Sequence, residues 1–267
     1  MLAVFTAGCS LVEMPSNKVL AGPPQTAPAS ASAAGRTAAP KPPQLEVTQA
    51  ERRSVNARTM SVSFSERVTG PADVTLTGQA QIQRTPLRIA EQVSVTGSGP
   101  TGQISVIVTG RYIYAETSKN PGYWIKLRLP QVDRTALLQE VRDADPAAQI
   151  SLLLAAGHAR FTGQRTVEGV VTSRYVASVA PEVALSALPS AQQARMASFV
   201  SLISGDIHYT LWIGPDDQLK QIRTRARVLG ANLTVTATIN SINRPVNIVI
   251  PQATLVPSPT GSVFASD

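Results

Sequence analysis

The side chains that could perform chemistry are few and scattered in this sequence of 267 residues. The chain has one Cys and two His, and neither His158 nor His208 lies in a motif such as H-E-x-x-H or beside a G-x-S-x-G nucleophile. A single Cys excludes an intrachain disulfide and a multi-cysteine zinc or iron–sulfur site. Neighbouring carboxylates occur only where helix capping and turn formation account for them. We therefore predict a protein that is not an enzyme and that uses no cofactor or metal.

One glycine-rich segment, Gly97–Gly102, matches the pattern G-x-G-x-x-G. A dinucleotide site requires a helix directly after the glycines, because the helix N-terminus binds the pyrophosphate. The apolar run Ile104–Val108 that follows here predicts a strand. We interpret the glycines as a turn between two strands.

Cys9 is the one residue for which the sequence suggests a specific modification. Residues 1–8 are largely apolar and end in the small residues Ala7 and Gly8. This arrangement resembles the lipobox of bacterial lipoproteins, in which signal peptidase II cleaves before the Cys and the thiol carries a diacylglyceryl group. Residues 1–9 would then be a signal-peptide remnant and lipobox, with the true start upstream of Met1. The alternative is a small buried hydrophobic residue near the terminus.

Residues 10–47 are rich in Pro, Ala, Ser and Thr. Such a segment cannot bury enough apolar surface to offset the entropy of ordering it, so we predict a mobile tether. The folded domain is expected over residues 48–256, and residues 257–267 are expected to form a flexible tail. No run of about 18 apolar residues is present, so no membrane-spanning helix is predicted.

The folded part alternates apolar and polar residues with a period of two in about eleven segments, the first at 60–64 and the last at 246–250. Turn residues separate the segments, so neighbouring strands should pair antiparallel. Three or four amphipathic helices are predicted, over 48–58, 133–143, 145–157 and 190–205. When one face of an antiparallel sheet is exposed to solvent, the other, apolar face must be buried, and we expect the helices to pack against it. We predict an α+β fold in which a large curled antiparallel sheet forms a half-barrel over the helices.

Several short strings carry a resemblance that adds to this interpretation. They are Met60–Phe64, Gly110–Glu116, Tyr123–Lys126, Gly205–Gly214 and Asn243–Pro251. Together with the order of the elements, from Thr48 to Pro251, they resemble the actinobacterial LppX/LprG-type lipoproteins. The resemblance implies a LolA/LolB-like half-barrel that holds acyl chains between sheet and helices, and a protein that binds or transports lipids or glycolipids in the cell envelope. It also implies anchoring in the cell membrane through Cys9, on the extracytoplasmic face.

The candidate cavity lining consists of apolar residues on the predicted helix faces and on the inner face of the sheet. These residues are Phe64, Leu76, Leu137, Leu138, Val141, Ile150, Leu153, Leu154, Met196, Phe199, Val200, Ile203, Leu211 and Val235. The same residues would form an ordinary closed core in a structural or interaction module that scaffolds a membrane complex. A low aromatic content of 4% favours an aliphatic, lightly filled interior.

Arg223, Arg225 and Arg227 share one face of a predicted strand. They form either a solvated outer face or a membrane-facing basic strip for anionic head groups. No aromatic residues interleave with them to stack bases, so nucleic acid is not expected as a partner. We expect a monomer whose partners are an acylated lipid or glycolipid and the membrane.

Overall fold

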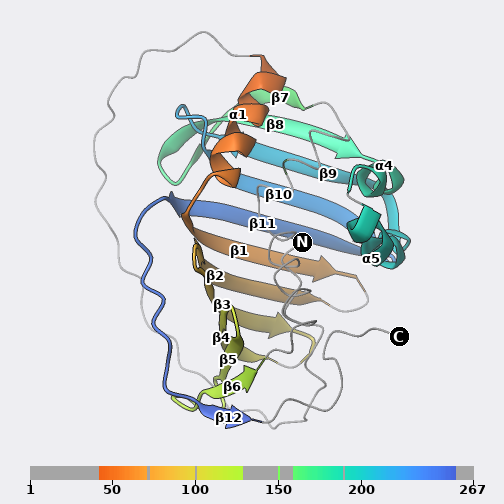
Figure 1. Ribbon diagram of the computed structural model, residues 1–267. Coiled ribbons are helices and arrows are strands. Elements are labelled where there is room, and N and C mark those ends of the chain that lie inside the picture. The colour runs from red at the N-terminus through yellow and green to blue at the C-terminus, as the bar shows by residue number, and fades with distance from the viewer. Residues whose placement is uncertain are drawn as a thin grey trace, which may run out of the picture.

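The computed structural model describes residues 42–70, 73–99, 101–128, 150, 159–188 and 190–256, and in this part of the chain one sheet of twelve strands dominates. The strands are β1 (Thr59–Thr69), β2 (Val74–Arg84), β3 (Leu87–Gly97), β4 (Gly102–Thr109), β5 (Tyr112–Thr117), β6 (Ile125–Arg128), β7 (Arg160–Val167), β8 (Val170–Val179), β9 (Ile203–Ile213), β10 (Leu219–Val228), β11 (Ala231–Ile242) and β12 (Thr254–Val256). Their order across the sheet is β12-β6-β5-β4-β3-β2-β1-β11-β10-β9-β8-β7 (Figure 1).

Most of this order follows from local sequence, because strands that are consecutive in the chain lie side by side. The β7–β8 and β10–β11 connections are two-residue turns, Glu168-Gly169 and Leu229-Gly230, in which both residues have positive φ. Such turns match the right-handed twist of paired strands, and glycine adopts the second position without strain. All neighbours pair antiparallel except β12, which runs parallel to β6.

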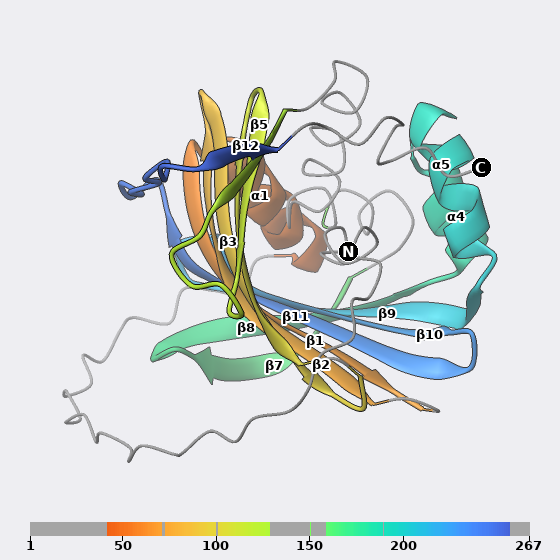
Figure 2. The ribbon, with the colours of Figure 1, turned by 90° about the horizontal axis from the view of Figure 1, so that it is seen from below.

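Besides the β6–β12 pairing, a second long-range pairing joins the two halves of the chain. β1 pairs with β11, so that Phe64 lies opposite Ala237. The resulting sheet is strongly curved, and Figure 2 shows β3 and β5 rising on one side while β8–β10 lie along the other. Alternation then gives the sheet an inner, apolar face and an outer, polar one: on β1, Met60 and Val62 are buried on the inner face. The main core continues across β8–β11 with Tyr175, Leu211 and other buried apolar side chains.

Three helices lie in the described part of the chain, and the longest two have 13 and 11 residues. They are α1 (Pro43–Val55), α4 (Pro181–Ser186) and α5 (Ser190–Val200). α1 lies inside the curve of the sheet and packs on β9 and β10, while α4 packs on α5 and β9 (Figures 1 and 2). None of the described helices is long and apolar enough to cross a membrane.

The predicted start of the first helix at Thr48 is wrong. α1 begins at Pro43, a residue type that suits the first turn because it has no N–H to satisfy. The Thr48 hydroxyl donates to the carbonyl of Gln44 at 2.8 Å, within the helix rather than at its cap. Residues 43–47 of the predicted tether are therefore helical, and Val47 is fully buried.

Two further expectations near the C-terminal half are corrected. The helix predicted over 190–205 ends at Val200, and β9 begins at Ile203 because that residue pairs with Val228 on β10. The strand predicted over 246–250 is absent, since both edges of β11 are already taken by β1 and β10. That segment instead packs Ile248 against Ile107 and Tyr114, and the chain rejoins the sheet at β12.

The prediction of a large, antiparallel-rich sheet is confirmed, with twelve strands rather than about eleven. The described part is mostly sheet, and its helices are few. α4 was not predicted, although Pro181 at its first turn is a recognisable start signal. The helices predicted over 133–143 and 145–157 lie outside the described residues, apart from Ile150, which is fully buried in the main core.

Candidate functional site

The inner face of β1–β4 carries two apolar clusters beyond the main core. Phe64, Ala80 and Val93 form the first, with Leu76 and Val95 packed against it. This cluster spans three adjacent strands, because Phe64 lies opposite Gly78 on β2 and Gly78 lies opposite Val93 on β3. The sheet therefore presents a band of apolar side chains that is continuous across these strands.

The second cluster extends the same face outward to β4. Ile89, Val106 and Val108 are buried in it, and Ile104 and Ile113 pack against them. These side chains are aliphatic, as expected for a sequence poor in aromatic residues. The two clusters together make the inner face of this arm a surface suited to other aliphatic groups.

Gly78 allows Phe64 to lie against the sheet. A Cβ atom at Gly78 would stand 2.5 Å from Phe64 Cζ and 2.3 Å from the carbonyl oxygen of Gln92, distances that atoms do not reach without a clash. Because Gly78 has no side chain, the ring of Phe64 can pack close to the backbone of the sheet at the centre of the apolar face.

Two carboxylic acids interrupt this apolar face. Glu66 on β1 and Glu91 on β3 are each 8% exposed. Burial raises the pKa of Glu91 to about 7 and also raises the pKa of Glu66. A carboxyl group that is neutral near pH 7 can donate a hydrogen bond as well as accept one.

These two acids were not predicted as buried groups, although the sequence carries a signal for them. Glu66 continues the alternation of Met60, Val62 and Phe64, and Glu91 falls between Ile89 and Val93, so both occupy positions where an apolar residue is expected. A charged residue type in phase with an apolar alternation indicates a buried ionisable group.

The opposite arm of the sheet is closed by α1. Tyr175 on β8 donates its hydroxyl proton to Glu46 Oε2 at 2.6 Å, and both side chains are buried. This hydrogen bond, with Val47 and Ala50 in the main core, fixes α1 over the inner face of β8–β10. Burial and the neighbouring Glu46 both raise the pKa of Tyr175, so the hydroxyl stays protonated and remains a donor.

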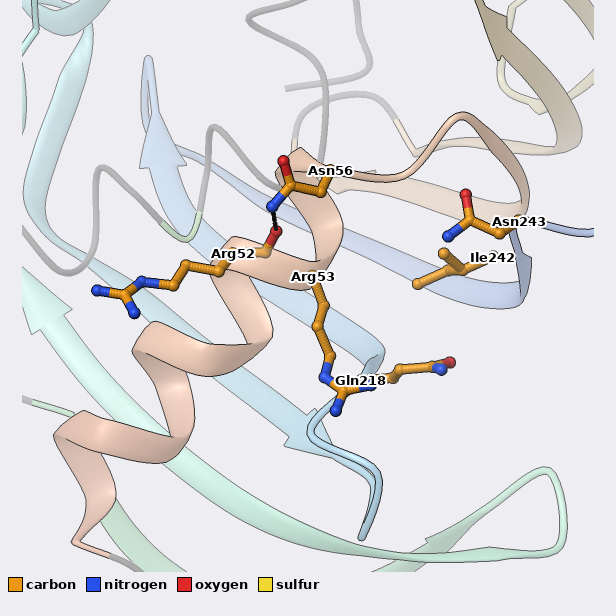
Figure 3. Close-up of a pocket in the computed structure, with 6 residues that line it drawn as sticks. All are labelled: Arg52, Arg53, Asn56, Gln218, Ile242 and Asn243. Atoms are coloured by element: carbon orange, nitrogen blue, oxygen red, sulfur yellow. Dashed lines mark hydrogen bonds between the residues drawn. The ribbon is translucent and has the colours of Figure 1, made fainter.

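A polar pocket of about 240 Å³ opens at the C-terminal end of α1 (Figure 3). Its lining comes from α1, from the β9–β10 turn and from the end of β11: Arg52, Arg53, Asn56, Gln218, Ile242 and Asn243. Figure 3 shows Arg53 extending toward Gln218, and the side chain of Asn56 hydrogen-bonded to the carbonyl of Arg52. Ile242 also packs against the main core, so the pocket adjoins the inner face. Guanidinium and amide groups suit an anionic or hydroxylated group.

The predicted cavity residues are partly brought together. Phe64, Leu211 and Val235 are buried on the inner face, Leu76 is half-buried there, and Ile203 packs on the main core from a strand rather than a helix. Val200 is the half-buried last residue of α5, and Met196 and Phe199 belong to the same helix. Cys9, Leu137, Leu138, Val141, Leu153 and Leu154 lie outside the described residues.

The predicted basic residues lie on the other side of the sheet. Arg223, Arg225 and Arg227 project from the outer face of β10, opposite the buried Ile222 on the inner face. His208 is exposed on the outer face of β9, and His158 lies outside the described residues. Among the described residues, no group of three or more His, Cys, Asp or Glu could hold a metal ion.

No family model matches this sequence, and no curated protein matches it in sequence. The fold, in contrast, matches solved structures. LprF from Mycobacterium bovis aligns with a TM-score of 0.53 and 15% identity, over 78% of this chain and 96% of LprF. The lipoprotein LppX from Mycobacterium tuberculosis aligns with a TM-score of 0.50 and 16% identity, over 77% of this chain and 97% of LppX.

The chain therefore has the fold of LprF and LppX, and the resemblance to LppX/LprG-type lipoproteins is confirmed at the level of the fold. A LolA superfamily protein from Nitrosomonas europaea also aligns, with a TM-score of 0.26 and 9% identity, over 73% of this chain and 91% of that protein.

Proposed function

We propose that this protein is an envelope lipoprotein that binds acylated lipids or glycolipids non-covalently and transports them. The single observation that carries the proposal is the largely apolar inner face of β1–β4, in a fold shared with LprF and the lipoprotein LppX. Acyl chains would lie along this face, in a cavity between sheet and helices. Each buried CH₂ group would contribute about 0.8 kcal/mol, so a long chain binds without any covalent chemistry.

Two polar features could recognise the head group. The pocket beside α1 offers the guanidinium groups of Arg52 and Arg53 next to the inner face. The carboxyl group of Glu91, with its pKa raised to about 7, could donate a hydrogen bond to an ester or hydroxyl oxygen of the lipid. Both features favour a ligand whose polar part is larger than a simple carboxylate.

The anchor belongs to the same proposal. Lipidated Cys9 would hold the protein on the extracytoplasmic face of the cell membrane, and the Pro- and Ala-rich segment before α1 would let the domain stand away from the bilayer. The domain would act as a monomer, because one sheet and its helices supply the whole apolar face.

The direct test is lipid mass spectrometry of purified protein. The full-length Cys9→Ser variant should be used, because it removes the covalent acyl group and leaves only non-covalently bound lipid to be detected. We expect about one molecule of acylated lipid, or more, to co-purify with each protein molecule. A Cys9→Ser protein that is free of lipid and binds none in titration would refute the proposal.

A pair of adjacent substitutions locates the bound lipid. Leu76→Trp places a large side chain on the inner face, and Thr77→Trp places the same side chain on the outer face of the same strand. We expect Leu76→Trp to reduce the bound lipid and Thr77→Trp to leave it unchanged. Equal lipid content in both variants would show that the ligand does not lie on this face.

A structural or interaction module is the second candidate function, and one observation favours it. Val249, Ile250 and Leu255 are 66%, 42% and 62% exposed close to the edge strand β12, where they could contact another protein. In that case the interior is closed: Leu76→Trp would lower the melting temperature by overpacking the core, and no lipid would be found in either variant.

A further inference from the structure

The outer face of β7–β10 gathers four arginines from three strands of the sheet. Arg174 on β8 lies directly opposite Trp212 on β9. The guanidinium carbons of Arg165 and Arg223 lie 5.9 and 5.3 Å from the centre of the Trp212 ring. Arg225 follows Arg223 on the same face of β10. We call Arg165, Arg174, Arg223 and Arg225 the outer arginine cluster.

Trp212 forms the floor of this cluster. It is only 1% exposed although it projects from the wet face of the sheet, whereas its neighbours Thr210 and His208 on that face are not buried. Its indole Nε1 is buried and has no hydrogen-bond partner among the described residues. A buried indole N–H normally has an acceptor, so an acceptor group is missing at this point.

The charge balance of the cluster is also one-sided within the part of the chain that the structure describes. Among the described residues, no ion pair joins the outer arginine cluster to a carboxylate. Two acids of this arm of the sheet have other partners: Asp206 accepts a hydrogen bond from Ser178 at 2.7 Å, and Asp216 pairs with Lys220 at 3.5 Å. The pKa of Arg223 is lowered by burial and then by the charges of Arg225, Arg165 and Arg174. The cluster is thus a site of mutual repulsion that an anion would relieve.

We propose that the outer arginine cluster is a binding site for phosphate groups, with Trp212 as its floor. Guanidinium forks match the oxygens of a phosphate group, and several can share one such group because it has more oxygens and more charge than a carboxylate. Arg223 Nε donates a hydrogen bond to the hydroxyl of Thr236 at 3.3 Å, and this bond orients the guanidinium group of Arg223. The phosphate could belong to a lipid head group at the membrane surface or to a free phosphate compound.

This site goes beyond the proposed lipid binding, because it lies on the opposite face of the sheet. It also differs from a general basic strip along β10. Arg227, on the same strand and face, is not part of the cluster and donates instead to the carbonyl of Gly230 at 3.4 Å. A failure at the outer face would leave the lipid content of the inner face unaffected, so the two proposals are tested separately.

Fluorescence of Trp212 provides the measurement. The chain has two tryptophans, so a full-length Cys9→Ser/Trp124→Phe protein reports from Trp212 alone. Inorganic phosphate is titrated at constant ionic strength against chloride, and vesicles of phosphatidylcholine with equal parts of phosphatidylglycerol are compared with pure phosphatidylcholine vesicles. We expect a saturable change of emission on binding, because the ligand contacts the groups that cover the ring.

Two double variants that each remove two positive charges test whether binding depends on the outer arginine cluster or only on the net charge of the protein. Arg165→Gln/Arg223→Gln removes two members, and Arg67→Gln/Arg227→Gln removes two exposed arginines from the same outer face. We expect the first to raise the apparent Kd by roughly tenfold or more, and the second to change it by less than about twofold. The melting temperature in chloride verifies folding, and the first variant should not melt below the parent because repulsion is relieved.

The outcomes assign the source of the phosphate. A response to inorganic phosphate alone assigns a free phosphate compound, and a response to anionic vesicles alone assigns a lipid head group. A response to both supports the site with either source. The proposal is overturned if neither probe gives a saturable response. It is also overturned if the two double variants lose binding equally.

Discussion

Replacement of Glu91 by Gln tests whether a carboxyl group is truly held in an apolar environment on the inner face. Its neighbours within the sheet are apolar: Ala80 on β2, Val106 on β4, and Ile89 and Val93 on its own strand. Burial among these groups raises the pKa from an ordinary value of 4.5 to about 7. Glutamine keeps the size and shape of the side chain and carries no charge at any pH.

The magnitude follows from linkage between protonation and folding. Between pH 4.5 and about 7 the folded protein keeps the proton on Glu91 while the unfolded chain releases it, so the free energy of unfolding falls as pH rises. One pKa unit corresponds to about 1.4 kcal/mol, and the rise from 4.5 to about 7 therefore corresponds to a loss of about 3 kcal/mol above pH 7. Below pH 4.5 both states are protonated, and the penalty vanishes.

Urea unfolding of the Cys9→Ser protein and its Glu91→Gln variant, followed at several pH values from 4.5 to 8.5, measures this difference. We expect the variant to gain stability relative to the parent as pH rises, by about 3 kcal/mol at pH 8 compared with pH 4.5. Glu168→Gln in the exposed β7–β8 turn is the control and should follow the parent. Parallel stability curves for parent and Glu91→Gln would refute the reasoning.

Two further predictions concern the contacts that shape the inner face. Tyr175→Phe should lower the free energy of unfolding by about 1–3 kcal/mol, because it leaves the buried carboxylate of Glu46 without its hydrogen-bond donor. Limited proteolysis should then cut α1 faster in the variant, and an unchanged cleavage rate would contradict the role of this hydrogen bond. Gly78→Ala should lower the melting temperature, because the added Cβ collides with Phe64 and with the strand backbone. Gly99→Ala is the control and should leave the melting temperature unchanged, because the space around Gly99 is open. Equal melting temperatures of the two variants would argue against the tight contact at Gly78.

The strands and their faces were largely predictable because alternation is a local property. The first predicted strand, 60–64, lies within β1, and the glycine-rich segment Gly97–Gly102 connects β3 to β4 as the sequence predicted. Turn residues marked the hairpins for the same reason, since a chain that reverses within two residues has only its neighbour to pair with.

The misassigned elements are those whose state depends on distant partners. Residues 246–250 have the alternation of a strand, yet no free edge of β11 was available to them. Ile203 fits a helical spacing, but pairing with Val228 extends β9 to include it. Local pattern supplies a propensity, and the partner that is present in space decides which propensity is realised.

By itself, the sequence determined that this chain forms a large antiparallel sheet with one apolar face, because that follows from residue alternation and turn chemistry. Only the tertiary structure decided how deeply Glu66 and Glu91 are buried on that face, and that Arg165 and Arg174 join Arg223 around Trp212 on the other. The reason is physical: burial and electrostatic repulsion depend on which strands lie side by side, and strand pairing brings together residues that the sequence keeps far apart.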